Sequence, residues 1–176
     1  MSIGQPSGID LALERPLDVP DWISSSLLFK SPFVLIAAES NPVVAEIADG
    51  AMLPMETFCL LPHAIRSIDG SMSGAVDAAL EASGRRRRVA LALPQFHAVA
   101  LAVASGPYIA AVPLQFATAV RRDLKLRLFR PPLDVPVPDV RLYWHSRHEQ
   151  DAVHRWMRGT IVNAVQDLGW PDMCPA

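Results

Sequence analysis

Polar side chains follow three apolar stretches of the sequence, at the points where residues 63–67, 89–93 and 108–112 end. Hydroxyl, carboxyl and amide groups there can fix a polar group of a ligand, and an aromatic ring can flank an apolar or aromatic body. This combination favours binding of a small molecule over catalysis. The candidate binding residues are Ser67, Asp69, Gly70, Ser71, Gln95, Phe96 and Pro113.

The segment 67–71 also has a purely structural interpretation. Serine and aspartate are common at helix starts, where their oxygen atoms accept hydrogen bonds from unpaired backbone N–H groups. The same residues would then cap a helix that begins near Met72. Both interpretations remain open at this point.

A second group of candidates contains histidines and carboxylates, which are metal-ligand types. Its members are His145, His148, Glu149, Asp151 and His154. They straddle a strand end, a turn and a helix start, whereas the ligands of a metal motif normally share one rigid element. We therefore expect a turn capped by Asp151, with His154 and Arg155 on a solvated face, and no metal or other cofactor. A metal-dependent enzyme that uses this cluster is the less favoured alternative.

Other reactive groups give little support for an enzyme. The four arginines of 85–88 lie between a helix and a strand, so a solvated connection is preferred over an anion site. Cys59 lies in an apolar helical stretch, which predicts a buried, inert thiol. The sequence has no Gly-x-Ser-x-Gly elbow, no phosphate-cradling glycine loop and no Gly-x-Gly-x-x-Gly. We predict that the protein is not an enzyme.

The candidate residues follow strands that alternate with helices. Each of the three apolar stretches is followed by a predicted helix, at about 72–82, 95–105 and 114–122. Strands joined by such short crossovers lie parallel in one sheet, so their carboxyl ends and the following helix N-termini converge on one edge. The fold class is therefore α/β. Further strands are predicted at 9–13, 27–29, 33–38, 126–129 and 140–145, with short helices at 42–48 and from 54 and a long helix from Asp151.

Composition narrows the function classes. The 176 residues are 51% hydrophobic and 19% charged, which is typical of a globular chain, and no apolar stretch is long enough to cross a membrane. A net charge of −2 argues against a dedicated nucleic-acid surface. Two cysteines and an N-terminus without a signal-peptide pattern predict a cytoplasmic location.

Three segments resemble the C-terminal effector-binding domain of LysR-type transcriptional regulators: residues 9–42, 58–113 and 141–158. The resemblance runs in family order from Ile9 to about Val165. The pattern Trp144-His145, Asp151 and His154-Arg155-Trp156 is most similar to the subgroup that responds to nitroaromatic compounds, salicylate-like acids and flavonoids. The histidines are then explained without a metal.

The resemblance implies a type 2 periplasmic-binding-protein-like fold, with two α/β lobes, a hinge of two strands and an effector in the cleft between the lobes. Residues 1–62 would form a partial first lobe, 63–125 a complete second lobe, and 126–176 the return to the first lobe with a C-terminal helix. The cleft positions match the turns that follow the three strands. Glu14, at the end of the first strand, would face them from the first lobe.

The resemblance also implies partners. The effector would be a small aromatic or organic acid, the chain would form a homodimer or higher oligomer, and DNA would be bound only through a winged helix-turn-helix domain that has no counterpart in this sequence. The start of the first lobe also lacks a counterpart, so apolar surface at 9–13 and 33–38 is expected to be uncovered and then buried by another chain. A truncated, ligand-free interaction module is the alternative function.

Overall fold

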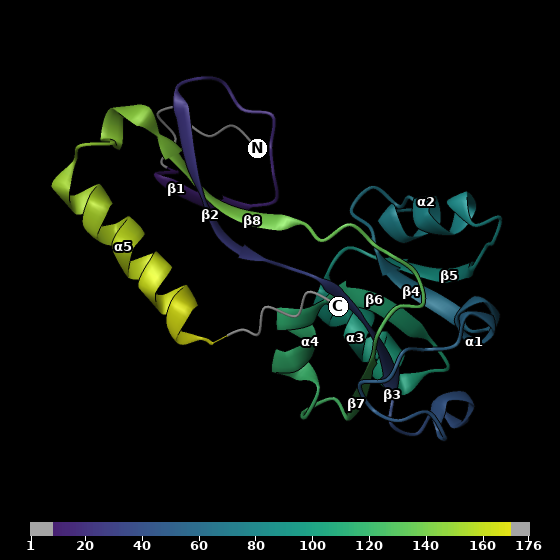
Figure 1. Cartoon of the computed structure of the whole chain (residues 1–176). Helices are drawn as coiled ribbons and strands as arrows, with labels where there is room; N and C mark the ends of the chain where they lie inside the picture. The colour runs from purple at the N-terminus through teal and green to yellow at the C-terminus, as the bar shows by residue number, and fades with distance from the viewer. Residues whose placement is uncertain (1–8, 170–176) are drawn as a thin grey trace. The chain divides into compact units, whose positions relative to one another are not determined.

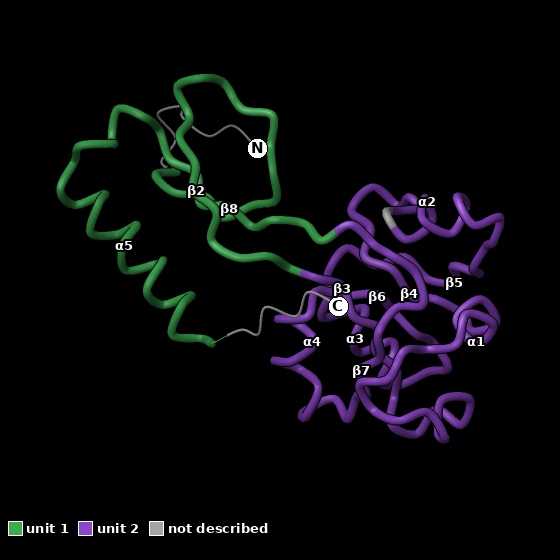
Figure 2. Tube along the Cα trace, in the orientation of Figure 1, with its two compact units in different colours: residues 1–31, 137–176 green, residues 32–136 purple. Residues whose placement is uncertain are grey.

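The computed structural model describes residues 9–169 and shows helices together with two β-sheets (Figure 1). The chain divides into two compact units, one formed by residues 1–31 and 137–176 and the other by residues 32–136 (Figure 2). No helix among residues 9–169 combines the length and the apolar character that a membrane span requires.

The unit of residues 32–136 contains a five-stranded sheet with the strand order β5-β4-β6-β3-β7. β4 pairs in parallel with both β5 and β6, and β3 pairs antiparallel with β6 and β7. The α/β class and the parallel arrangement of the three predicted strands are therefore confirmed. The strands are β3 (Phe33–Ala38), β4 (Pro62–Arg66), β5 (Arg88–Leu93), β6 (Ile109–Pro113) and β7 (Leu126–Phe129).

Helices cover both faces of this sheet. They are the 3-10 helix η1 (Pro42–Val44), α1 (Met55–Leu60), α2 (Ala75–Ala82), α3 (Phe96–Ser105) and α4 (Leu114–Val120). β3 shows the two faces by its alternation: Val34 and Ile36 pack with α3 and α4, whereas Leu35 and Ala37 pack with α1 and α2. The connection from β4 to β5 and the one from β5 back to β6 run in opposite directions, so right-handed crossovers place α2 and α3 on opposite faces.

The expectation that residues 33–38 expose apolar surface is wrong. β3 lies between β6 and β7, and the exposed fractions of Leu35, Ile36 and Ala37 are 1%, 0% and 0%. The same long-range pairing places 32–62 and 126–136 in one compact unit with 63–125. The lobe boundaries implied by the resemblance remain a prediction. The helix expected at 42–48 is only the three-residue η1, and α2 begins at Ala75 rather than Met72.

The other unit has an antiparallel sheet of three strands, in the order β1-β8-β2, followed by the longest helix. β2 begins at Ile23, earlier than predicted. Its first half contains three serines that pair with β8, and these polar residues do not give the apolar pattern by which strands were predicted. The buried Tyr143 hydroxyl accepts a hydrogen bond from the Leu17 N–H at 2.9 Å and fastens the loop after β1. The elements are β1 (Leu11–Glu14), β2 (Ile23–Lys30), β8 (Asp139–His145), the 3-10 helix η2 (Ser146–His148) and α5 (Ala152–Asp167).

The arginine run of 85–88 is not uniformly solvated. The side chain of Arg87 is only 3% exposed and pairs with Asp77 at 2.7 Å. Its Nη1 also lies 3.3 Å from His63 Nδ1, while His63 Nε2 lies 2.8 Å from the Phe58 carbonyl oxygen. A carbonyl only accepts, so Nε2 carries the proton and Nδ1 accepts from Arg87. Arg87 thus connects α2 to the parallel strands.

Replacing Arg87 should destabilise the larger unit strongly. Arg87→Ala leaves the buried His63 nitrogen and the Asp77 carboxylate without their partner, and we expect a loss of about 2–4 kcal/mol in the free energy of unfolding. The matched control is Arg86→Ala, which removes an exposed arginine of the same run and should change stability by less than about 0.5 kcal/mol. Chemical denaturation measures both; equal effects would contradict the role of Arg87.

His63 should make stability depend on pH. Burial lowers the pKa of His63 from 6.5 to about 4, and the Arg87 guanidinium acts in the same direction. Between these values the unfolded chain binds a proton that the folded chain does not, so stability should fall by about 3 kcal/mol as pH drops from 6.5 towards 4. The denaturation midpoint should change more steeply with pH in the wild type than in His63→Gln across this range. Parallel pH dependences of the two midpoints would refute the lowered pKa of His63.

Candidate functional site

The turn after β4 is organised around one carboxylate. Asp69 Oδ1 accepts hydrogen bonds from the Ser67 hydroxyl and from the Ser71 N–H, each at 3.0 Å. The Ser71 N–H and then the Ser67 hydroxyl hold the pKa of Asp69 below its usual range. Gly70 takes a left-handed backbone with φ of 80°. The result is an exposed turn at the end of a parallel strand, with hydroxyl oxygens still able to accept hydrogen bonds.

This turn does not cap the following helix. The N-cap of α2 is Gly74, and its N–H donates to Asp77 Oδ2 at 2.7 Å. The Asp69 carboxylate is used within the turn instead. The capping interpretation of residues 67–71 is therefore wrong.

The turn after β5 presents an aromatic ring. Gln95 occupies the N-cap position of α3 without a side-chain cap, and Phe96 is the first helical residue. The Phe96 ring lies 5.6 Å from the ring of Phe116 on α4, and His97 lies 5.1 Å from the same ring. Phe116 was not predicted, although its place in the first turn of the helix after β6 was a usable signal. The helices that follow β5 and β6, the strands on either side of β4, thus bring their aromatic rings together.

Arg66 was also missed by the sequence analysis. It is the exposed last residue of β4, and its Nε donates to the Pro94 carbonyl oxygen at 3.3 Å. Its guanidinium carbon lies 5.6 Å from the centre of the Phe96 ring, which is within the range of a cation–π contact. Among residues 9–169, no salt bridge to Arg66 is formed. An arginine at the end of a parallel strand was the signal that could have identified it.

The sheet topology brings these turns to one edge. β4 is the neighbour of both β5 and β6, so Ser67 and Gln95, which follow β4 and β5, lie at the same edge as Pro113, which ends β6. The helix after β4 packs on one face of the sheet and the helix after β6 on the other. The connections that follow these adjacent strands therefore turn to opposite faces of the sheet. Open α/β sheets bind ligands at the carboxyl ends of such strands.

Glu14 belongs to the other compact unit. It ends β1 opposite Arg141 of β8, and its Oε1 accepts a hydrogen bond from the Arg15 N–H at 2.8 Å. Its expected position facing the turn after β4 remains a prediction.

Three members of the predicted histidine cluster have structural partners. Asp151 accepts from the His154 N–H at 2.9 Å and caps α5, as predicted. Glu149 accepts from Trp144 Nε1 at 2.8 Å, and the His145 ring lies 5.1 Å from that of Trp22. His154 itself is only 8% exposed, so its expected position on a solvated face is wrong. Its imidazole is stacked on the ring of His148.

The model of the LysR substrate binding domain family matches residues 6–166. The chain belongs to this family. The transcriptional activator NahR of Pseudomonas putida is 24% identical over 163 residues, which are 93% of this chain and 53% of NahR. The chain therefore spans about half the length of this relative.

Solved structures agree with the family assignment. The regulatory domain of MexT, a transcriptional activator of Pseudomonas aeruginosa, has a TM-score of 0.73 and 28% identity and covers 88% of this chain and 72% of that domain. The effector-binding domain of QuiR has a TM-score of 0.66 at 13% identity, over 90% of this chain and 72% of that domain, and shows the fold alone. The periplasmic-binding-protein-like fold predicted from the sequence is confirmed.

The left-handed backbone at Gly70 provides a test of the turn. No atom lies within 4 Å of a Cβ built at this residue, so substitution should affect only the backbone conformation. Gly70→Ala should lower the free energy of unfolding by about 1 kcal/mol. Gly70→Asn is the control at the same position and should cost less, because asparagine tolerates this conformation better. Equal losses in chemical denaturation would argue against the turn geometry.

Proposed function

We propose that this domain senses a small aromatic or organic acid, which binds at the carboxyl edge of β4, β5 and β6. The observation that carries the proposal is Arg66, an exposed guanidinium held beside the Phe96 ring by the Pro94 carbonyl. A cation next to an aromatic surface matches a ligand that combines a carboxylate with a ring.

The chemistry of recognition follows from these side chains. A guanidinium binds a carboxylate with two parallel hydrogen bonds, and Arg66 has its terminal nitrogens available because its internal contact uses Nε. The rings of Phe96 and Phe116 offer an apolar surface on which an aromatic body can pack. The Ser67 hydroxyl and the 67–71 turn supply further polar contacts, with Gln95 and Pro113 bordering the same edge. The QuiR domain of the same fold was solved in complex with shikimate, so this fold holds a small acid in that protein.

Signalling would work by population shift. A ligand that contacts both compact units stabilises the arrangement in which those contacts are made, and Glu14 is our proposed contact from the smaller unit. In a longer regulator of this family, that shift would reach a DNA-binding domain in a cytoplasmic homodimer. The named relatives are transcriptional regulators, and we propose no catalysed reaction for this chain.

A second candidate function is an interaction module without a ligand. Exposed apolar side chains of the smaller unit favour it: Trp156 is 69% exposed, Val153 is 64% and Leu13 is 50%. A partner chain that covers them would stabilise this unit. The two functions differ in their response to small acids.

Ligand binding tests the proposal. Salicylate and benzoate should raise the melting temperature, since a ligand at 100 times its dissociation constant adds about 2.7 kcal/mol. Benzamide, which has the ring without the charge, should bind more weakly. Arg66→Gln should weaken benzoate binding about tenfold or more, because it removes a charge-assisted pair. Isothermal titration calorimetry measures each dissociation constant.

The matched control uses an arginine at the opposite edge of the sheet. Arg88 is an exposed residue that begins β5, whereas Arg66 ends β4, so Arg88→Gln makes the same chemical change away from the site. It should leave benzoate affinity unchanged. Equal affinity in Arg66→Gln, Phe96→Ala and the wild type would place the site elsewhere. No stabilisation by any of these acids would favour the interaction module.

A further inference from the structure

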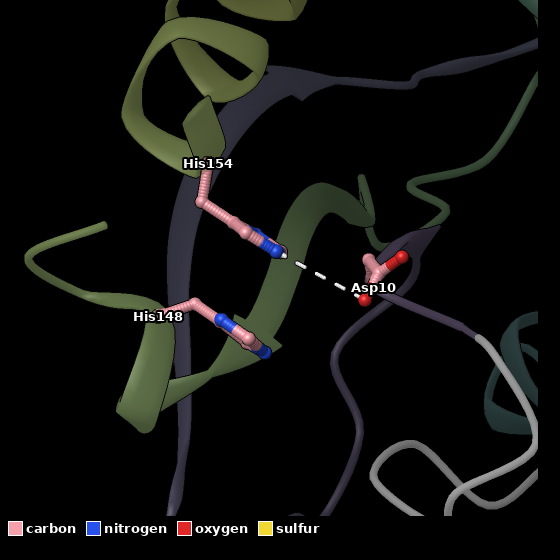
Figure 3. A group of neighbouring side chains, drawn as sticks. All are labelled: Asp10, His148 and His154. Carbon is pink, nitrogen blue, oxygen red and sulfur yellow. Dashed lines mark ion pairs between the residues drawn. The ribbon is translucent and has the colours of Figure 1, made fainter. Parts of the chain in front are cut away.

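Three potential metal ligands from distant parts of the sequence lie together in the smaller unit. One ligand atom from each of Asp10, His148 and His154 lies within 4.8 Å of the others. Asp10 immediately precedes β1, His148 ends η2, and His154 lies in the first turn of α5. In Figure 3 both imidazole rings extend from their backbones towards the side on which the Asp10 carboxylate lies. The sequence analysis considered the histidines without Asp10, which is 138 residues before His148.

The imidazole rings of His148 and His154 lie face to face. They are stacked, with centroids 3.9 Å apart and planes inclined by 9°. Each ring offers its lone pairs in its own plane, so one ring must turn before both can bind a single ion.

His154 is a buried histidine with one unpartnered ring nitrogen. Its Nδ1 is buried and has no hydrogen-bond partner among the described residues. Its Nε2 lies 3.9 Å from Asp10 Oδ1, which is an ion-pair distance but too long for a hydrogen bond. Buried polar atoms are nearly always bonded to protein, water or an ion, so this ring is missing a partner.

His148 is held in the form that can bind a metal. Its Nε2 accepts a hydrogen bond from Arg147 Nε at 2.8 Å, so this nitrogen carries no proton. Arg147 competes for the lone pair, but it is exposed and can turn into solvent. The backbone of His148 is fixed from the other side, because Arg158 donates to the His148 carbonyl oxygen at 3.2 Å and to that of Glu149 at 3.1 Å.

We propose that Asp10, His148 and His154 form a binding site for a first-row transition-metal cation such as Zn²⁺. Two imidazoles and one carboxylate suit zinc, and water completes a tetrahedral site. Donors in such a site lie roughly 3.4 Å apart, given bonds of about 2.0–2.1 Å, so the group must contract from its 4.8 Å spread. The Asp10 side chain is 61% exposed and can move to meet the ion.

The ion would act as a structural clip. It would join the residue before β1 to the turn between β8 and α5, closing a long stretch of chain. Binding energy at a site formed only in the folded state adds to folding stability. The site shares no residue with the proposed effector site, whose contacts other than Glu14 lie in 32–136.

Zinc titration of the full chain tests this site. We expect one Zn²⁺ per chain by calorimetry and a rise in melting temperature that a chelator reverses. Asp10→Asn and His148→Gln should each weaken Zn²⁺ binding about tenfold or more, since even outer partners of metal ligands contribute about this much. Both avoid the fully buried core, so the variants should fold.

The control and a spectroscopic measurement separate this site from chance binding. His97→Gln removes an exposed histidine of the other unit and should leave zinc affinity unchanged. Co²⁺ should give visible d–d absorption typical of four-coordinate geometry, lost in Asp10→Asn. Unchanged Zn²⁺ affinity in both Asp10→Asn and His148→Gln, or no saturable binding to the wild type, would overturn the proposal.

Discussion

The parallel pairing of β4 with both β5 and β6 is the constraint on which the candidate site depends. Because the three strands run in the same direction, each must be followed by a turn and a helix at the same edge of the sheet. Arg66, Phe96 and Phe116 come from three different elements, and no local interaction would bring them together. The partly buried ion pair of Arg87 with Asp77 supports the same arrangement from the other end, because it ties α2 to the start of β5.

Much of the larger unit could be predicted because apolar runs with proline boundaries identify its strands. The bounds of β3 and β7 agree with the predicted ranges, β5 begins one residue earlier, and β4 and β6 are each shifted by one residue. The pairing of the strands was harder to predict from the sequence. The antiparallel contacts of β3 with β6 and β7 link residues about 75 to 95 positions apart, which no local pattern encodes, and they decide which segments share a core.

The site was predicted in part for the same reason. Turn residues such as Ser67 and Phe96 follow strands directly, so their edge could be inferred from strand order alone. The position of Arg66 at a strand end was a usable signal, but no local pattern distinguished Arg87 from a solvated arginine, because the His63 ring that it contacts is brought in by folding. Asp10 and His154 meet for a similar reason: the register of β1 against β8 aligns Leu11 with Trp144.

The tryptophans, which dominate the fluorescence of a protein, are unevenly distributed between the two compact units. All four tryptophans belong to residues 1–31 and 137–176, whereas the proposed effector contacts Arg66, Phe96 and Phe116 lie in the other unit. Trp144 is buried, bonded to Glu149 and covered by the Arg158 guanidinium 4.6 Å from its ring. An acid that affects only the larger unit leaves these indoles unchanged. A change in tryptophan emission upon ligand addition would therefore show that the acid also affects the smaller unit, through Glu14 or through the larger unit.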